Sequence, residues 1–230
     1  MNIALVIPAA GVGARMQADR PKQYLELSGK TVLEHTVTAL LQALPDQPIF
    51  LALAQDDPYF PKLPLATMSN VHRVAGGTER ADSVLSALRQ IDAQLYPWVL
   101  VHDAARPLVS RDDILQLIAN CQLAQHGGIL ACQVRDTMKR GAEHQPCHLV
   151  EHTVSRQHLW HALTPQLFPT VQLRDALTAA LAAGVVVTDE ASAMEWAGLP
   201  VLLSPGRADN LKITQPEDLA LARFYLEQAL

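Results

Sequence analysis

The amino-acid sequence predicts an α/β fold, in which a mostly parallel sheet carries helices on both faces. Short apolar runs rich in Val, Ile and Leu recur, and they are continuous instead of alternating, as expected for strands buried on both faces. Stretches with helical periodicity separate these runs. One polar segment, residues 133–156, breaks the alternation and predicts a projecting β-arm, with a turn at Gly141–Pro146.

The strands and helices can be placed from these patterns. The predicted strands are Ile3–Ile7, Ile49–Leu53, Trp98–Val101 and Ile129–Val134. The first helix begins at Thr31, which has the spacing of a capping box with Glu34. The predicted helices are Thr31–Ala43, Ala81–Leu95, Asp112–Gln125 and a last one that begins around Thr214, Pro216 and Glu217.

Composition favours one domain over residues 1–230 and argues against two classes of partner. Hydrophobic residues make up 49% of the chain and charged residues 18%, which provides enough apolar surface for a packed core. The formal net charge of −5 argues against binding to a nucleic-acid polymer. No apolar stretch approaches the ~18–20 residues of a membrane span, so no membrane partner is expected.

Cysteine usage favours a reducing compartment. The three cysteines, Cys121, Cys132 and Cys147, are odd in number and show no CxxC spacing, so free thiols are expected instead of a disulfide framework. The N-terminal apolar run has no basic segment before it and leads into a glycine loop, so we interpret it as a strand and not as a signal peptide. A cytoplasmic location is therefore expected.

A glycine loop follows the first predicted strand. Gly11 and Gly13 would let the backbone approach phosphate groups closely. A full dinucleotide fingerprint needs a third glycine where Met16 stands, and a P-loop that ends at residues 29–31 needs a glycine where Tyr24 stands. Neither standard phosphate-binding loop is therefore present.

Positive charge gathers around this loop, at Arg15, Arg20 and Lys22. Ligands of α/β sheets bind beyond the carboxyl ends of the strands, where these cations are expected to lie. They would suit a triphosphate. A solvated basic loop is the alternative that these residues leave open.

Seven sequence blocks in order resemble one family. They are PAAGVGARM with PKQYLEL (8–16 and 21–27), GGTERADSV (76–84), VHDAARP (101–107), RDTMKR (135–140), LWHALTPQLF (159–168), TDEASAMEW (188–196) and NLKITQPEDL (210–219). Together they resemble the 2-C-methyl-D-erythritol 4-phosphate cytidylyltransferases of the non-mevalonate isoprenoid pathway. The resemblance covers nearly the whole chain without a large insertion.

This resemblance implies a single Rossmann-like nucleotidyltransferase domain, whose β-arm at about 133–156 builds a homodimer. It implies CTP and a polyol phosphate as substrates, and magnesium as cofactor. Arg15 and Lys22 are similar to the family's transition-state stabilisers, and Arg156 and Lys212 to the residues that place the polyol phosphate. Further substrate-binding positions implied are Ala9, Ala10, Gly11, Gly13, Gly76, Gly77 and Ser83 for the nucleotide, and Asp103, Arg106, Thr137, Thr164 and Thr188 for the acceptor.

The expected chemistry agrees with these residue types. A phosphate oxygen of the acceptor would attack the α-phosphorus of CTP, and pyrophosphate would leave. Because a phosphate monoester has a second pKa near ~6, the acceptor is already an anionic nucleophile at pH 7 and needs no general base. The enzyme then has to position the reactants and stabilise charge, which suits the four predicted cations.

Three further details remain open at this level. Asp103 follows a predicted strand, and it could add a ligand to magnesium held mainly by the CTP phosphates, accept from a substrate hydroxyl, or cap a loop. Ser83 could contact the base or cap a helix. The spacing of His144, His148 and His152 could suit zinc on a helix face, but the segment is predicted as strand and turn, so a plain arm surface is favoured.

Three other functions compete with the expected one. A related cytidylyltransferase that acts on a pentitol phosphate would show similar loops and differ in the acceptor pocket. A nicotinamide-dependent oxidoreductase is disfavoured because Met16 replaces the third glycine. A non-catalytic nucleotide sensor is disfavoured because it would not need cations for both reactants.

Overall fold

The computed structural model describes residues 1–11, 16, 18–143 and 149–228. Within these residues, seven strands form one sheet in the order β11-β7-β10-β6-β1-β4-β5. Four neighbouring pairs run parallel, and the two pairs that involve β10 run antiparallel, so the predicted mostly parallel sheet is confirmed. The strands are β1 (Ile3–Pro8), β4 (Ile49–Leu53), β5 (Val71–Ala75), β6 (Trp98–Val101), β7 (Gly128–Gln133), β10 (Trp160–Pro169) and β11 (Leu202–Pro205).

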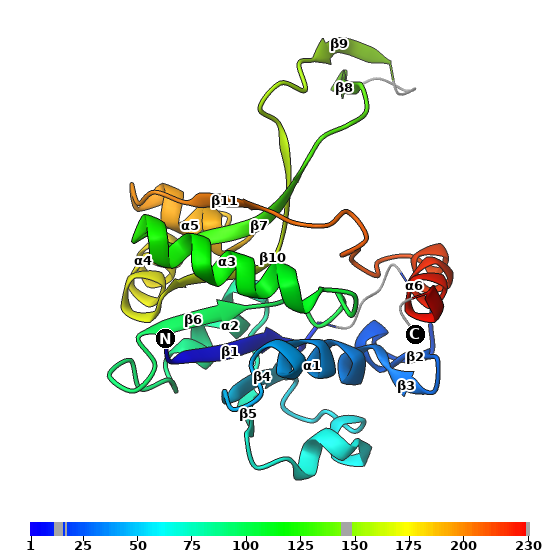
Figure 1. Ribbon diagram of the computed structural model, residues 1–230, viewed down its shortest axis with the longest axis vertical. Helices are drawn as coiled ribbons and strands as arrows, with labels where there is room; N and C mark the ends of the chain where they lie inside the picture. Colours follow the sequence, from blue (N-terminus) through cyan, green and yellow to red (C-terminus); the bar gives the residue numbers. More distant parts are fainter. Residues whose placement is uncertain (12–15, 17, 144–148, 229–230) are drawn as a thin grey trace.

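Helices cover both faces of this sheet, as predicted (Figure 1). Alternate residues of β1 enter two separate cores: Leu5 packs in the cluster that contains α1 and α3, and Val6 in the one that contains α2, α4 and α5. The helices are α1 (Val32–Ala43), α2 (Arg80–Leu88), α3 (Arg111–Ala124), α4 (Thr170–Ala182), α5 (Glu190–Trp196) and α6 (Pro216–Gln228). Further short elements are the 3₁₀ helices η2 (Lys22–Tyr24), η3 (Phe60–Lys62) and η4 (Pro64–Thr67), and the strands β2 (Glu26–Leu27) and β3 (Lys30–Thr31).

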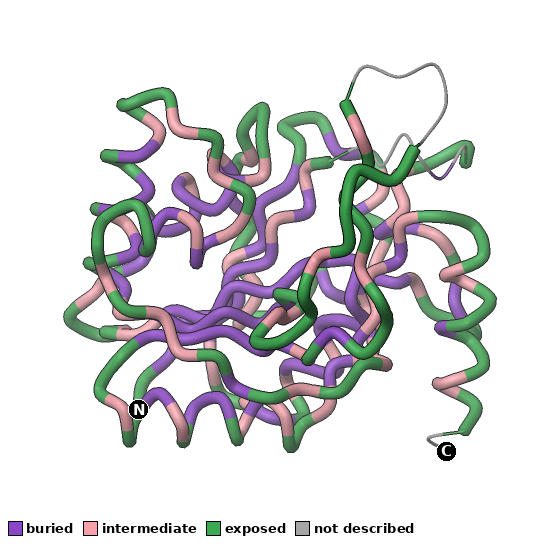
Figure 2. Tube along the Cα trace, turned by 90° about the horizontal axis from the view of Figure 1, so that it is seen from above, coloured by how far each residue is buried: buried purple, intermediate pink, exposed green. Residues whose placement is uncertain are grey.

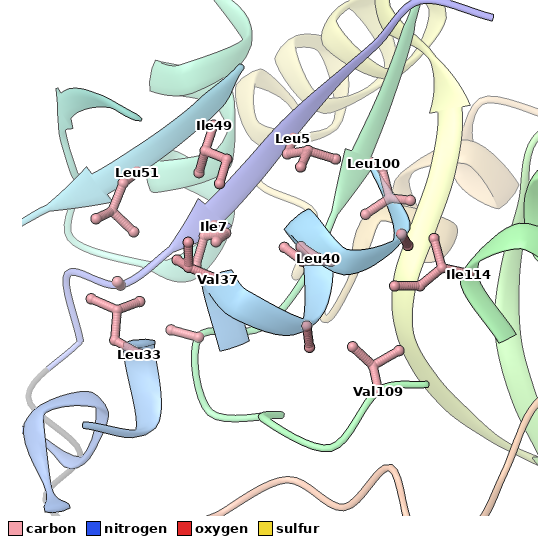
Figure 3. Close-up of a cluster of buried hydrophobic side chains, with 14 of the residues drawn as sticks. Leu5, Ile7, Leu33, Val37, Leu40, Ile49, Leu51, Leu100, Val109 and Ile114 are labelled. Atoms are coloured by element: carbon pink, nitrogen blue, oxygen red, sulfur yellow. The ribbon is translucent and has the colours of Figure 1, made fainter. Parts of the chain in front are cut away.

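The apolar stripe of α1 anchors the larger core. Figure 3 shows Val37 and Leu40 between the sheet and the segment that carries Val109 and Ile114. Each fully buried side chain of this size contributes roughly 1.5–3 kcal/mol by leaving water. The predicted capping box starts the helix, since Glu34 donates its backbone N–H to the Thr31 hydroxyl and its carboxylate accepts from the Thr31 N–H.

The helix predicted over Ala81–Leu95 is shorter than expected. It ends at Leu88, after which short-range turn bonds replace the helical ladder: Gln90 donates to the Ala87 carbonyl. Leu95 is 59% exposed and thus does not extend the buried stripe. The prediction beyond Leu88 is therefore wrong: apolar residues continue as far as the buried Ile91, although the helical backbone has already ended.

The polar segment predicted as an arm contains its own two-stranded sheet. β8 (Met138–Gly141) pairs antiparallel with β9 (Val150–Val154). Figure 1 shows this hairpin well away from the seven-stranded sheet, and Figure 2 shows mostly exposed residues along it. The predicted turn at 141–146 lies partly outside the described residues.

None of the helices in the described ranges combines the length and apolar character that a membrane crossing requires.

Candidate active site

The carboxyl ends of β1, β4, β5 and β6 meet at one edge of the sheet, because these strands are parallel. Two pockets open there, of about 290 Å³ and about 240 Å³. Three charged residues, Arg80, Asp103 and Lys212, line both. The site therefore has two chambers with a shared charged boundary. We name them the first pocket and the second pocket.

Backbone and small residues line much of the first pocket. Ala9, Ala10 and Gly11 follow β1, and Gly77 follows β5. Gly76 lies behind them, where a Cβ atom would come within 2.4 Å of the Ala10 Cβ. The two loops can therefore approach this closely only because one of them carries glycine.

Ser83 joins the loop and the helix of the first pocket. The Gly77 N–H donates to the Ser83 hydroxyl at 3.0 Å, and that hydroxyl donates to the Glu79 carbonyl at 3.2 Å. The suggestion that Ser83 caps the helix is wrong, because Glu79 is the N-cap of α2 and forms a capping box with Asp82. Ser83 also lines the pocket, as the nucleotide-binding prediction requires.

Lys22 reaches the first pocket from η2. Its Nζ atom donates to the Ile213 carbonyl at 3.0 Å, so it lies next to the segment that carries Lys212. The neighbouring Tyr24 hydroxyl donates to the Asp57 carboxylate at 2.6 Å, and burial followed by this bond raises the pKa of Tyr24. The bond fixes η2 against the loop after β4. Arg15 and Gly13 lie outside the described residues.

The second pocket holds most of the residues predicted for the acceptor. It is lined by Arg106, Thr164, Thr188, Asp103 and Lys212. These residues come from the end of β6, from β10, from the start of α5 and from the segment before α6. The fold thus brings together positions that are spread over more than a hundred residues of sequence.

Asp103 is the centre of a buried charge cluster. One carboxylate oxygen accepts from Arg80 Nε at 2.9 Å, and the other lies 2.9 Å from Lys212 Nζ and 3.4 Å from Arg106 Nε. Burial alone would raise the pKa of Asp103, but Arg80 and Lys212, and then Arg106, outweigh it and hold the pKa well below its usual range. Asp103 is therefore a permanent anion that holds three cations at the pocket boundary.

Arg80 and Glu190 were missed by the sequence predictions. Arg80 donates to both carboxylate oxygens of Glu190, at 2.7 and 3.0 Å, and Glu190 is completely buried. The two residues are 110 positions apart. Both occur in the sequence blocks that carried the family resemblance, but no local spacing predicts that they meet.

A buried neutral histidine, His102, supports the charge cluster around Asp103. His102 lies directly after β6, and its Nε2 lies 2.9 Å from the Arg106 carbonyl, which can only accept. Nδ1 must then accept, so the Thr164 hydroxyl donates to it at 2.9 Å and itself accepts from the Asp103 N–H at 3.1 Å. Burial lowers the pKa of His102 to about 4. The proton of Thr164 is therefore used within the fold, and towards a ligand this hydroxyl can act only as an acceptor.

The predicted arm residues lie elsewhere. Thr137 and Arg156 flank the β8–β9 hairpin, both are exposed, and neither lines the two pockets. The Arg156 guanidinium donates to the Arg135 carbonyl of the same segment. His152 is exposed on β9, whereas His144 and His148 lie outside the described residues. Within the described ranges, no group of three His, Cys, Asp or Glu side chains could hold a metal ion.

A glycine-lined pocket joined to a cation-lined pocket, at the carboxyl edge of an α/β sheet, is typical of a nucleotidyltransferase. The chain belongs to the 2-C-methyl-D-erythritol 4-phosphate cytidylyltransferase family, whose model matches residues 3–228. Relatives of that name are similar over almost their whole length. The one from Vibrio cholerae serotype O1 (strain ATCC 39315 / El Tor Inaba N16961) is 59% identical over 228 residues, which are 99% of this chain and 97% of the relative.

The protein of that name from Vibrio atlanticus (strain LGP32) is 58% identical over 228 residues, covering 99% of this chain and 96% of the relative. Among solved structures, a crystal structure of 4-diphosphocytidyl-2C-methyl-D-erythritol synthase superimposes with a TM-score of 0.82 at 36% identity and covers 98% of both chains. Family, relatives and fold therefore agree over nearly the whole chain.

Proposed function

We propose that the chain transfers a cytidylyl group from CTP to 2-C-methyl-D-erythritol 4-phosphate, with CTP in the first pocket and the acceptor in the second. The products are 4-diphosphocytidyl-2-C-methyl-D-erythritol and pyrophosphate. The observation that carries this assignment is the shared boundary, because Arg80, Asp103 and Lys212 line both pockets. A phosphate group in the second pocket would then lie next to the α-phosphate of CTP in the first.

The reaction proceeds by in-line attack of the acceptor phosphate, without a general base. A phosphate oxygen forms a bond to the α-phosphorus of CTP, and the bond from that phosphorus to the bridging oxygen breaks, so that pyrophosphate carries the electron pair away. The low pKa of Asp103 supports this view, because a permanently ionised carboxylate paired with three cations is a poor proton acceptor. Lys22, with Arg15, would stabilise the developing charge, and Lys212, with Arg156, would place the acceptor.

Magnesium is proposed to enter with CTP. The two Asp103 oxygens already bond to cationic side chains, and no cluster of three metal-ligating side chains lies within the described residues, so these residues do not form a magnesium cage. The phosphates of CTP would therefore be the main ligands, with Asp103 as a candidate further ligand beside Arg80 and Lys212. When bound, the ion neutralises phosphate charge.

The hairpin is proposed to complete the site of a second copy in a homodimer. Thr137 and Arg156 resemble acceptor-site residues of the family, yet they are exposed and line neither pocket of their own chain. A projecting hairpin could reach a partner, and two-fold symmetry would then make two equivalent shared sites.

A cytoplasmic location is also proposed. It is supported by the two described cysteines, Cys121 and Cys132, which are both free.

The experiment that tests this function is incubation with CTP, magnesium and a panel of polyol phosphates, with pyrophosphate release as the readout. We expect efficient turnover with 2-C-methyl-D-erythritol 4-phosphate. Preferential turnover with a pentitol phosphate would replace the acceptor but keep the cytidylyltransferase chemistry. Absence of pyrophosphate release with every acceptor would overturn the proposal.

A further inference from the structure

Two buried glutamines brace the backbone of the two pockets, one for each. Gln23 lies in η2 next to Lys22, is 4% exposed and lines the first pocket. Its Nε2 atom lies 2.8 Å from the Ala9 carbonyl and 3.1 Å from the Gly11 carbonyl. Because both partners can only accept, the amide NH₂ group must face them. Gln23 therefore ties η2 to the loop after β1.

These two hydrogen bonds hold the loop at the point where it leaves the sheet. Ala9 is still attached to β4, since its N–H donates to the Ala52 carbonyl at 2.8 Å. Gly11 has no side chain that could anchor the loop by packing, and a Cβ built there would meet nothing within 4 Å. Gln23 supplies the missing constraint through the two carbonyls. Each carbonyl oxygen keeps a second lone pair, with which it can accept from a ligand.

Gln166 has the equivalent place under the second pocket. It lies in β10, is 1% exposed and lines this pocket. Its Nε2 donates to the Asp189 carboxylate at 2.8 Å and to the Leu163 carbonyl at 3.3 Å, while its Oε1 accepts from the Ala191 N–H at 2.9 Å. The amide orientation is therefore fixed on both sides. Gln166 joins β10 to the first turn of α5.

The segment held by Gln166 carries residues of the second pocket. Thr188 and Asp189 line that pocket, and the next residue, Glu190, makes the buried ion pair with Arg80. Moving the start of α5 would thus displace the Thr188 backbone and the partner of Arg80 together. The first pocket receives no residue from this segment.

We propose that Gln23 and Gln166 are positioning residues, Gln23 for the nucleotide in the first pocket and Gln166 for the acceptor in the second. The proposal rests on the proposed function, since it assigns a different substrate to each pocket. Neither side chain takes part in bond making. Each holds groups that line mainly one pocket, so each should affect the binding of that pocket's substrate most. Arg80 lines both pockets, but it keeps its bond to Asp103 when the start of α5 moves.

Methionine is the informative substitution because it keeps the unbranched shape of glutamine and removes the amide hydrogen bonds. Gln23→Met should raise the KM for CTP about tenfold and change the acceptor KM by less than about twofold, which is the expected scale for one or two lost hydrogen bonds. Gln166→Met should do the reverse. The exposed Gln172 on α4 provides the matched control, and Gln172→Met should leave both KM values unchanged.

A binding measurement without turnover covers the case in which a methionine variant folds poorly. Gln23→Glu keeps the shape but directs a carboxylate at two carbonyl oxygens, so the Kd for CTP measured by calorimetry should rise more than tenfold. Gln166→Glu should leave that Kd within about twofold of wild type. Circular dichroism and the urea midpoint would establish that each variant folds.

The possible outcomes distinguish a failure of the positioning roles from a failure of the proposed function. A wild-type chain that transfers no cytidylyl group would overturn the proposed function. An active wild type whose glutamine variants shift both KM values equally, or neither, would leave that function intact and overturn the positioning roles. An unchanged Kd for CTP in folded Gln23→Glu would overturn the role of Gln23.

Discussion

The two pockets of the site are built in different ways. Loop backbone and small side chains line the first pocket, and Gly76 and Gly77 allow its loops to pack closely against Ala10 and Asp82. In the second, charged side chains from distant segments pair around Asp103, and the buried Glu190 and His102 support them. The first pocket is therefore suited to recognising the shape of a nucleotide and the hydrogen-bonding edge of its base. The second is suited to holding an anion in a fixed field of charge.

The largest effect is expected from Lys22, which brings a charged side chain into the first pocket. Lys22→Ala removes a preorganised charge aimed at the transition state, and steady-state kinetics should show a fall in kcat of roughly 10²–10³. Lys22→Arg should restore it only in part, because a guanidinium is planar and broader than an ammonium. The exposed Lys30 in β3 offers a control, since Lys30→Ala should keep wild-type turnover. Wild-type kcat in Lys22→Ala would contradict a role for Lys22 in stabilising the transition state.

The next effect concerns stability and the buried support of the second pocket. His102 has a pKa of about 4 in the folded chain, below the unfolded value of ~6.5. The unfolded chain therefore gains a proton as the pH falls through ~6.5, while the folded chain stays neutral until about 4. The stability that comes from neutral His102 is complete above ~6.5 and is lost on acidification, by about 3 kcal/mol at most.

Urea unfolding at pH 7 and at pH 4.5 would measure this loss. His102→Gln cannot take up a proton, so its free energy of unfolding should fall less between the two pH values than that of wild type. The carboxylates are the same in both proteins, so their contributions to the fall largely cancel in the comparison. An identical fall in both proteins would show that His102 does not control the acid sensitivity of this cluster.

Base selectivity should depend on the first pocket and not on the second. Backbone carbonyls around residues 9–11 can accept from the exocyclic amine of cytosine, whereas uracil would present a carbonyl to them. CTP should exceed UTP by at least about a hundredfold in kcat/KM, with allowance for a bridging water. Thr188→Val alters the second pocket and should leave this ratio unchanged. Similar use of both nucleotides by wild type would contradict the proposed contacts.

The smallest effect tests whether the second pocket is completed by the hairpin of a partner. Lys22→Ala alters the core and Arg156→Ala the hairpin. With a shared site, a mixed dimer has one site with both lesions and one with none. Random pairing makes about half of the dimers mixed, and half of their sites are intact, so co-expression should restore roughly a quarter of wild-type activity.

Each single variant expressed alone should be nearly inactive. If size-exclusion chromatography shows that the chains pair but the mixed preparation is as inactive as its parents, then each hairpin serves its own chain. Both pockets would then be formed by the residues of a single subunit.

The sequence by itself determined the features that depend on neighbouring residues. Buried strands such as β1 and β6, the capping box at Thr31 and the glycine loop after β1 all follow from local periodicity and residue type. These are interactions within a few positions of the chain, so their signals lie side by side in the sequence. Local spacing was also misleading at α2, where it extended the helix past Leu88 and offered Ser83 as its cap.

Only the tertiary structure decided how the second pocket is assembled. β10 enters the sheet antiparallel between β6 and β7 and brings Thr164 and Gln166 under the charge cluster. The Arg80–Glu190 pair joins segments 110 residues apart. No periodicity encodes such pairings, because they form only when the ends of distant strands and helices meet at one edge of the sheet. The buried charges that meet there must then form ion pairs with one another, because water cannot solvate them. The sequence therefore identified residues of the second pocket through family resemblance, while folding determined which of them bond.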